Sequence, residues 1–289
     1  MQISEVTQKR GTALPHLETS TIVVEPRSGL NLRLNELWHY RDLLYFLVWR
    51  DIKVRYKQTA LGASWAILQP VLATIVFSIF FGRLAKMPSD GVPYPVFAYV
   101  GLLPWQLFAY SLTESSNSLV SNQNLIRKVY FPRLIIPLSA VLAGLVDFAI
   151  AFFVLVVMLL AYGIRPGPSL VVLPLFLALA VGSALAAGLW LSALNVQYRD
   201  VRYTIPFLTQ IWMFVTPVVY PSSLVPERWR AFYGLNPMAG VVEGFRWAFL
   251  GKSEHSGSLI WVSASMVVLL LVGGLAYFRR MESTFADVV

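Results

Sequence analysis

The side chains best suited to binding a partner lie in one short basic segment, residues 122–137, NQNLIRKVYFPRLIIP. Its cations and the aromatic residues between them are Arg127, Lys128, Tyr130, Phe131 and Arg133. Pro132 ends any helix that begins near Asn124, because proline disfavours helical backbone before it. Apolar runs of membrane length flank the segment. Such a turn either stops the flanking spans at the lipid headgroups or docks into a soluble partner that pushes on them.

A single carboxylate, Asp147, lies near the middle of an otherwise uncharged apolar run, 136–162. Inserting a carboxylate there costs roughly 2.5 to 3.5 kcal/mol on insertion scales, which favours a functional role. Proton transfer is one such role, although a relay needs several groups and this run offers one. Bonding to a neighbouring helix, through Ser, Gln or Asn, is an equally good explanation.

Two other apolar runs carry aromatic residues that are candidates for contact with a substrate. They are Tyr94, Phe97, Trp105, Phe108, Phe207, Trp212 and Phe214. The first four share one helical face, on which Gly101 leaves a gap. Trp105 and Trp212 lie near the middle of their runs, where an interfacial aromatic belt does not explain them. Aromatic faces suit the C–H faces of sugar rings, and core packing between helices explains them equally well.

No constellation of a soluble enzyme is present. Gly251-Lys252-Ser253 resembles the end of a phosphate-binding loop, but the first glycine of that loop would fall at 246, which is Arg246. The three histidines are scattered along the chain, and there is no cysteine. We therefore predict no catalytic residue and no metal site. If ATP drives this protein, another polypeptide hydrolyses it.

Composition identifies the elements that must position these residues as membrane-spanning helices. The chain is 57% hydrophobic and only 13% charged, and the apolar residues come in long blocks. These values predict an all-α polytopic membrane protein. The net charge of +8 fits Lys and Arg anchors at an anionic inner leaflet, so nucleic acid is not needed as a partner.

Six spans are predicted within a permease domain at 61–281. Their approximate ranges are 61–82, 94–112, 136–162, 170–194, 203–220 and 259–278. The first run has 22 residues without a charge, roughly 33 Å of helix, which matches a hydrocarbon core of about 30 Å. Pro95 and Pro104 are expected to bend or break the second span. Small residues at 182–188 offer the fourth span a face for close helix contact.

The predicted N-terminal region has two parts. Residues 1–34 form a loosely ordered cytoplasmic tail. Residues 35–60 form an amphipathic interfacial helix, with a soluble helix packed on a partner as the alternative. Lys53, Arg55 and Lys57 place positive charge at its inner end. Asp51 precedes Arg55 by four residues, the favourable order for a helical ion pair.

The region between the fifth and sixth spans is predicted to form short re-entrant helices at the outer face. Asn236-Pro237, Glu243 and Arg246 would interrupt and charge a full span there, whereas irregular backbone is tolerated against protein or water. Lys and Arg concentrate on the other side of the bundle, which places both termini in the cytoplasm.

Several motifs together identify a resemblance to a known family. They are RYKQTALG at 55–62, SWAILQP at 64–70, GLLPWQLFA at 101–109, NLIRKVYFPR at 124–133, LNVQYRDVRY at 194–203, TPVVYP at 216–221 and LNPMAGVVEGFR at 235–246. In this order and spacing, residues 37–280 resemble the permease subunit of ATP-binding-cassette (ABC) polysaccharide exporters, the O-antigen and teichoic-acid export family.

The resemblance implies a homodimer that forms a channel and binds two cytoplasmic ABC ATPase subunits. ATP and magnesium would bind to those partners, and this chain would bind no cofactor. The implied ATPase-coupling residues are Ile126, Arg127, Lys128, Tyr130, Phe131 and Arg133. The implied outer gate comprises Pro221, Asn236, Pro237, Glu243 and Arg246. The seven aromatic residues would contact the sugar chain.

The implied function is export of a lipid-linked, O-antigen-like polysaccharide across the bacterial inner membrane. The basic mouth at Lys53, Arg55 and Lys57 suits an undecaprenyl diphosphate or plain lipid headgroups. One alternative is a proton-coupled secondary transporter that uses Asp147. Others are a teichoic-acid or capsule exporter of the same architecture and a membrane enzyme acting on lipid-linked sugars. That enzyme would need clustered carboxylates or a metal site, and the sequence shows neither.

Overall fold

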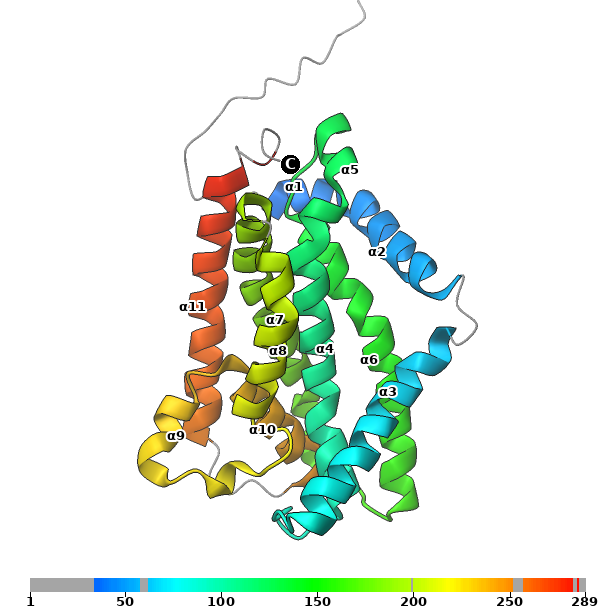
Figure 1. The fold of residues 1–289 in the computed structure, drawn as a ribbon, viewed down its shortest axis with the longest axis vertical. Helices are drawn as coiled ribbons and strands as arrows, with labels where there is room; N and C mark the ends of the chain where they lie inside the picture. The colour runs from blue at the N-terminus through cyan, green and yellow to red at the C-terminus, as the bar shows by residue number, and fades with distance from the viewer. Residues whose placement is uncertain (1–33, 58–61, 199, 252–256, 283–284, 286–289) are drawn as a thin grey trace, which may run out of the picture. The chain divides into compact units, whose positions relative to one another are not determined.

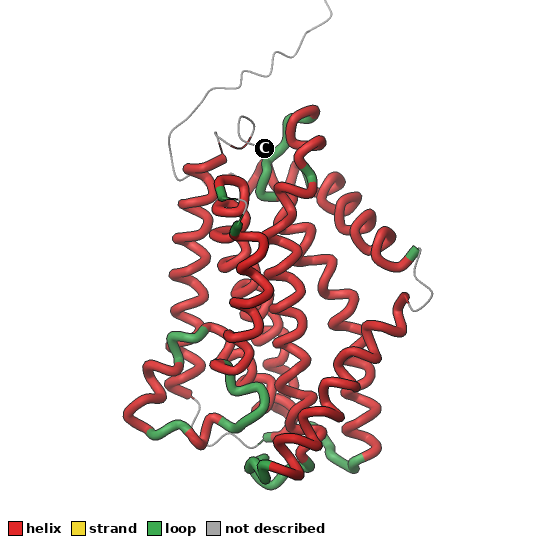
Figure 2. The backbone as a smooth tube through the Cα atoms, in the orientation of Figure 1, coloured by secondary structure: helices red, strands yellow, loops and turns green. Residues whose placement is uncertain are grey.

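Helices make up all the regular structure in the described part of the chain, as the all-α prediction requires (Figures 1 and 2). The computed structural model describes residues 34–57, 62–198, 200–251, 257–282 and 285. The predicted tail at 1–34 lies almost entirely outside these residues. The prediction of an α-helical membrane protein is confirmed.

In the described part of the chain, five helices are long and apolar enough to cross a membrane. They are α3 with the π-helical turn η1 (Gly62–Phe77 and Ser78–Leu84), α4 (Tyr94–Ser121), α6 (Ile135–Ala161), the 3₁₀ turn η2 with α7 (Pro168–Val172 and Leu173–Gln197), and α11 (Gly257–Glu282). The predicted fifth span corresponds to α8 (Val201–Val215). Its 15 residues reach about 22 Å, so this helix ends before the predicted boundary at 220.

Helix α4 lies at the centre and contacts α6, α7, α10, α3 and α8 (Figure 1). Of its most apolar stretch, 78% is buried, against 11% for α3. The prediction was a bend or a break at Pro104; the helix continues through this residue, which excludes the break. Pro95 lies in the first turn of α4, where the backbone N–H that proline lacks would have no partner within the helix. The small-residue face on α7 is confirmed, because a Cβ on Gly188 would lie 1.9 Å from Oγ of Ser115 on α4.

The predicted interfacial helix is two helices, α1 (Leu34–His39) and α2 (Arg41–Tyr56), which meet at Tyr40. Residues 58–60 of the predicted range lie outside the described residues. Within α2, all of which the structure describes, Leu47 alone is buried. Large apolar side chains remain exposed on both helices, including Trp38, Phe46 and Trp49. This exposure is compatible with a position in the membrane interface, which stays a prediction.

The two ends of the bundle carry different short helices. At one end lie α1, α5 (Gln123–Lys128) and the end of α11 (Figure 1). At the other end, between α8 and α11, lie the 3₁₀ turn η3 (Ser222–Leu224), α9 (Glu227–Tyr233) and α10 (Pro237–Leu250). Helix α10 packs against α11, α4 and α7. The basic segment and the short helices predicted for the outer face therefore lie at opposite ends.

Candidate functional site

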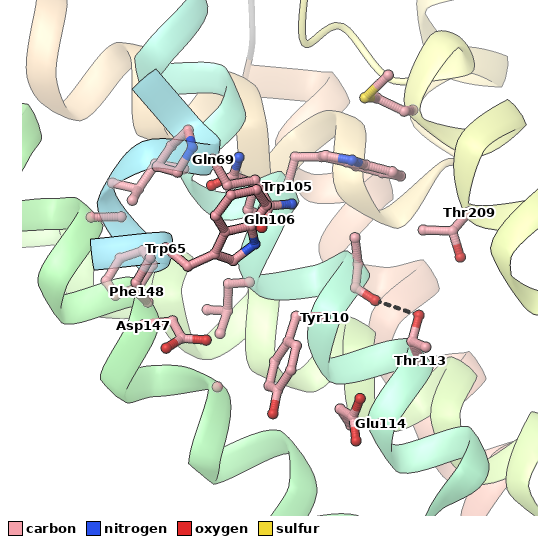
Figure 3. A pocket seen from close by; sticks show the side chains of 18 of the residues that line it. Trp65, Gln69, Trp105, Gln106, Tyr110, Thr113, Glu114, Asp147, Phe148 and Thr209 are labelled. Atoms are coloured by element: carbon pink, nitrogen blue, oxygen red, sulfur yellow. Dashed lines mark hydrogen bonds between the residues drawn. The ribbon is translucent and has the colours of Figure 1, made fainter. Parts of the chain in front are cut away.

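A cleft of about 440 Å³ is formed by side chains of α3, α4, α6 and α8, with Arg55 of α2 (Figure 3). Its polar lining residues are Arg55, Gln69, Gln106, Thr113, Glu114, Asp147, Thr209 and Gln210. Trp65 on α3 and Trp105 and Tyr110 on α4 place aromatic rings in the same wall. Aromatic faces beside amide, hydroxyl and carboxylate groups can pack against a sugar ring while bonding its hydroxyls.

Asp147 is joined to the interfacial helix. Its carboxylate forms an ion pair with the Arg55 guanidinium and accepts a hydrogen bond from the Tyr56 hydroxyl. The Arg55 guanidinium also lies 3.9 Å from the centre of the Tyr110 ring. Two residues predicted for separate sites, at the mouth and inside the membrane, therefore form one cluster that links α2 to α6. One of the two explanations for Asp147 was a bond to a neighbouring helix through Ser, Gln or Asn. The structure shows such a bond, but the partners are Arg55 and Tyr56.

The surroundings of Tyr56 keep its hydroxyl protonated, so that it can donate the hydrogen bond to Asp147. Burial, and then the hydrogen bond to Asp147, raise the pKa of Tyr56 above its ordinary value. The phenol therefore stays protonated at any physiological pH. The other two cations of the predicted mouth, Lys53 and Lys57, remain exposed, and Nζ of Lys53 lies 5.1 Å from the Trp49 ring.

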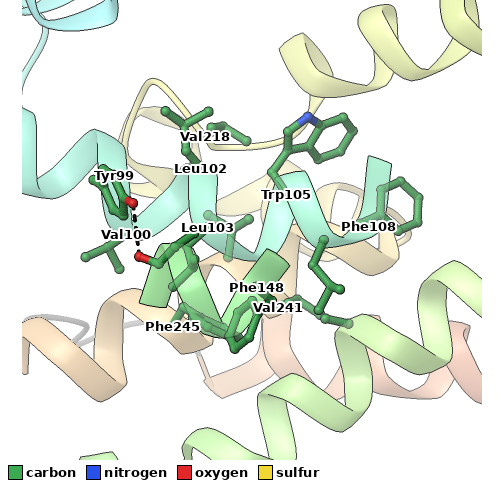
Figure 4. Packing of buried hydrophobic residues seen from close by; sticks show 14 of the residues in the cluster. Tyr99, Val100, Leu102, Leu103, Trp105, Phe108, Phe148, Val218, Val241 and Phe245 are labelled. Carbon is green, nitrogen blue, oxygen red and sulfur yellow. Dashed lines mark hydrogen bonds between the residues drawn. The ribbon is translucent and has the colours of Figure 1, made fainter. Parts of the chain in front are cut away.

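The seven predicted channel aromatics divide into buried and exposed groups. On α4, Trp105 and Phe108 are buried in the hydrophobic cluster that Figure 4 shows, and Phe97 is buried as well. On α8, Phe207 and Phe214 have 64% and 51% of their surface exposed. The buried group packs helix against helix. Contact of the exposed group with a sugar chain stays a prediction.

The remaining two aromatic residues, Tyr94 and Trp212, make contacts between α4 and the region around the end of α8. The Trp212 ring meets Phe108 edge-on, with ring centres 5.0 Å apart. The Tyr94 hydroxyl donates to the carbonyl of Val219 at 2.7 Å. Both aromatic residues therefore tie α4 to the region at the end of α8.

Asn236 joins the end of α8 to the start of α10. Its Oδ1 accepts hydrogen bonds from the backbone N–H of Met238 at 3.1 Å and from Nε1 of Trp212 at 2.9 Å. Its Nδ2 donates to Oγ1 of Thr216 at 2.9 Å. Asn236 is thus the N-cap of α10, and Pro237 takes the first helical position, where proline is favoured. Both belong to the predicted outer gate.

Arg246 holds the segment 216–220 against α4. Its Nη2 donates to the carbonyl of Val218 at 2.7 Å and its Nη1 to that of Tyr220 at 3.2 Å. The guanidinium lies 3.8 Å from the centre of the Phe97 ring, and Nη1 lies 3.8 Å from Oε2 of Glu243. Pro221, the last predicted gate residue, follows directly as the N-cap of η3.

Gly101 allows this close approach. A Cβ at position 101 would lie 2.9 Å from both Nη2 of Arg246 and the carbonyl oxygen of Val218. The gap that the sequence predicted on the aromatic face is therefore filled by Arg246. The sequence contained a signal for this contact, because an arginine in an apolar helix must find carbonyl or aromatic partners.

The predicted coupling residues fall into an exposed and a buried set. Arg127, Lys128 and Tyr130 are exposed, whereas Ile126 and Phe131 are buried beneath them. Residues 126–131 and 133 surround a hollow of about 320 Å³. Helix α5 ends at Lys128, before Pro132, as the sequence predicted. Arg133 differs from the other cations, because its guanidinium donates to the carbonyl of Glu282.

The structure adds no support for phosphate or metal chemistry. Gly251 adopts a left-handed conformation, with φ of 67°, and ends α10 as its C-cap. Residues 252 and 253 of the loop-like tripeptide lie outside the described residues. Among the described residues, no group of three or more His, Asp or Glu side chains could hold a metal ion.

Comparison with known proteins gives a consistent result. The sequence model of the ABC-2 type transporter family matches residues 42–250. An O-antigen export system permease protein RfbA from Myxococcus xanthus is 31% identical over 88% of this chain and 98% of its own length. Another RfbA, from Klebsiella pneumoniae, is 31% identical over 86% and 95%.

A more distant relative is the polysialic acid transport protein KpsM of Escherichia coli. It is 24% identical over 81% of this chain and 91% of its own length. The family match covers most of the bundle, including the cleft-lining helices, the basic segment at 122–137 and the junction at Arg246. This chain is a member of the ABC-2 type transporter family.

Proposed function

We propose that this chain is the channel-forming permease subunit of an ABC exporter. It moves a lipid-linked polysaccharide of O-antigen type from the cytoplasm across the bacterial inner membrane. A separate ATPase subunit supplies the energy, and this chain itself is not an enzyme. The proposal is supported by relatives whose names state O-antigen export and by the cleft in Figure 3.

The cleft is the observation that carries the proposal. Gln69, Gln106 and Gln210 offer amides to sugar hydroxyls, and the exposed Trp65 offers a ring face. None of these groups is a strong nucleophile or a metal ligand set, so the lining suits passage of a polyhydroxylated chain rather than chemistry on it. A polymer needs many weak contacts that exchange as it moves, and this lining supplies them.

A second copy of the chain would close the cleft into a channel. Helices α3 and α8 flank the cleft and expose most of their apolar side chains, and Ile205 is the one buried residue of α8, all of which is described. A symmetric dimer that uses these helices would place the exposed aromatics of α8 along the lumen. Each protomer would bind one ATPase subunit at α5.

Movement would reach the lumen through the helices that flank α5 in the chain. ATP binding would draw the two ATPases together and displace α5, with its exposed Arg127, Lys128 and Tyr130. The displacement would pass to α4 and α6, which flank α5 in the chain and form walls of the cleft. At the far end, Arg246 and Asn236 would transmit the tilt of α4 and α8 to the outer helices.

The test is transport by the reconstituted complex. The permease and its ATPase are placed in vesicles with O-antigen polymer on undecaprenyl diphosphate, and sugar exposed on the far face is measured. We expect export that requires both subunits, ATP and magnesium. Export by the permease alone, or export driven by a proton gradient without ATP, would overturn the proposal.

A capsule-type substrate is the second candidate, because one relative is named a polysialic acid transport protein. The same vesicles loaded with polysialic acid on its lipid anchor separate the two substrates. The higher identity to O-antigen permeases favours the O-antigen polymer as the faster substrate. Faster export of polysialic acid would assign the chain to capsule export instead.

A further inference from the structure

Glu282 and Phe285, at and after the end of α11, contact the predicted coupling residues within 126–133. Phe285, which follows α11, has no exposed surface and belongs to the same buried cluster as Ile126 and Phe131. Its ring meets Phe278 of α11 edge-on, with centres 5.2 Å apart, and the Arg133 guanidinium lies 6.0 Å from its centre. The complete burial of this aromatic ring shows that Phe285 packs into the cluster.

Glu282, the last residue of α11, makes a second connection. Its carboxylate accepts a hydrogen bond from the backbone N–H of Arg133 at 3.2 Å, and its carbonyl accepts one from the Arg133 guanidinium. Arg133 lies two residues before the start of α6, whose own N-cap, Leu134, has no side-chain acceptor. A carboxylate at the N-terminus of α6 and a cation at the C-terminus of α11 each favour the local helix dipole. The two helix ends are thereby fastened to each other.

This connection matters because α5 is not continuous with α6. Val129 is extended, with φ of −131° and ψ of 134°, and residues 129–134 form no helix. A flexible connection of this kind would absorb a displacement of α5 instead of passing it on. Burial of Phe131 and the bonds to Arg133 fix the connection at its α6 end.

We propose that Glu282 and Phe285 are positioning residues of the coupling apparatus, which fasten the segment that receives the ATPase's movement to the last span. The proposal rests on the proposed function, in which α5 contacts the ATPase. A displacement of α5 would then move α6 and α11 together. The pair acts through Arg133 and need not touch the ATPase or the polymer.

Four variants test this in the reconstituted complex. Phe285→Ala removes the docked ring and Phe285→Leu retains an apolar side chain. Glu282→Ala removes the carboxylate and Glu282→Gln retains an acceptor for the Arg133 N–H. Leu269→Ala is the control, because Leu269 lies on the same helix with 68% of its surface exposed. ATPase association, ATP hydrolysis and O-antigen polymer exported per ATP are measured for each.

We expect both alanine variants to retain ATPase association and hydrolysis while exported polymer per ATP falls about fivefold or more, the lower range of coupling between sites. Phe285→Leu, Glu282→Gln and Leu269→Ala should remain close to the unaltered complex. Unchanged export per ATP in both alanine variants would overturn the proposal. So would a loss of assembled complex with normal export per assembled complex, which indicates a structural role alone. Failure of the proposed function would appear differently, as absence of export by the unaltered complex.

A second measurement needs no polymer. The chain has no cysteine, so Phe153→Cys on α6 and Val268→Cys on α11 introduce two unique spin-label sites at exposed positions. In the complex trapped with an ATP analogue, we expect a narrow distance distribution between the labels that Phe285→Ala broadens. The same distribution with and without Phe285→Ala, in both nucleotide states, would overturn the proposal.

Discussion

At the scale of single residues, the charged groups inside the bundle are held by specific partners. Asp147 is held by Arg55 and Tyr56, and Arg246 by two backbone carbonyls, Phe97 and Glu243. Both carboxylate oxygens of Asp147 are engaged, Oδ2 by the Arg55 guanidinium and Oδ1 by the Tyr56 hydroxyl. The ion pair therefore favours a structural role for Asp147 over the proton-coupled alternative.

Separate substitutions of the pair should have unequal effects. Arg55→Ala leaves a carboxylate unpaired among apolar helices, whereas Asp147→Asn keeps an acceptor for the Tyr56 hydroxyl. Complete burial would make the first change cost about 3–5 kcal/mol. The Arg55 and Asp147 side chains keep 35% and 18% of their surface exposed, so we expect about 2 kcal/mol. Thermal unfolding in detergent measures it.

The double variant Arg55→Ala/Asp147→Asn is the control for this pair. It removes both charges, so it should be more stable than Arg55→Ala alone, and Asp147→Asn alone should still export. Additive losses would mean that the two side chains are energetically independent. Loss of export on Asp147→Asn in an otherwise stable protein would restore the proton-coupled alternative.

At the scale of helices, the central feature is the junction where α4, α10 and the end of α8 meet. Gly101 lets the guanidinium of Arg246 and the carbonyl of Val218 approach α4. Asn236 adds hydrogen bonds from the start of α10 to Trp212 and Thr216 of the α8 end. These contacts make the short outer helices an extension of α4 and α8, so tilting of either span would move them.

Gly101→Ala should disturb this junction. The added methyl group would lie 2.9 Å from a backbone oxygen that cannot rotate away. Overpacking of this kind costs about 1 to 3 kcal/mol, which exceeds the roughly 1 kcal/mol that alanine gains over glycine in a helix. Lower thermal stability and reduced export are expected. The matched control is Gly257→Ala on α11, where a Cβ meets nothing within 4 Å. Equal stability of the two variants would contradict the assignment.

Sequence patterns predicted where the helices lie in the chain better than which residues of different helices contact each other. Long apolar runs define α6, α7 and α11 within a few residues, because burial in lipid requires continuous helix. Helix α4 instead continues to Ser121, well beyond its predicted end at 112. The patterns failed where tertiary contacts decide the outcome. Helical spacing predicted an ion pair between Asp51 and Arg55, whereas Arg55 forms an ion pair with Asp147 in the structure. Tyr56 and Asp147 are 91 positions apart in the sequence, so no local pattern reveals their contact.

The sequence predicted some residues of the candidate site, such as Trp105 and Asp147, but not how they are arranged. Trp105 and Phe97 were expected on an aromatic face, and they lie on one, but packing among α4, α8 and α10 buries them. The amides of Gln69, Gln106 and Gln210 carry no sequence motif, so only the assembled helices reveal them as one lining. Glu282 and Phe285 fall after the last apolar run, where sequence patterns gave no reason to expect a contact.

At the scale of the whole molecule, one protomer has an exposed apolar side and a cationic end. The exposed side comprises α3 and α8, which flank the cleft, and the cationic end carries Arg127 and Lys128 of α5. The first suits a second copy of the chain and the second suits an ATPase. Both assignments can be tested separately, because they involve different elements.

The dimer can be tested by crosslinking in native membranes. Phe207→Cys places the chain's one thiol on the exposed face of α8, and the residue should meet its own copy near a two-fold axis. A short bis-maleimide should then give a dimer. Phe153→Cys on α6 is the control, equally exposed but on a helix that does not belong to the proposed interface. Equal crosslinking of the two variants would remove α8 from the interface.

Charge reversal at the cationic end should separate ATPase binding from transmission of movement. Arg127→Glu with Lys128→Glu inverts two exposed charges, which should weaken ATPase co-purification by at least about tenfold. Arg133→Gln removes a guanidinium that is bonded to Glu282, so it should leave association intact and lower export per ATP. If Arg133→Gln weakens association as much as the double reversal does, Arg133 contacts the ATPase directly. The boundary between receiving and transmitting residues would then lie beyond Arg133, closer to α6.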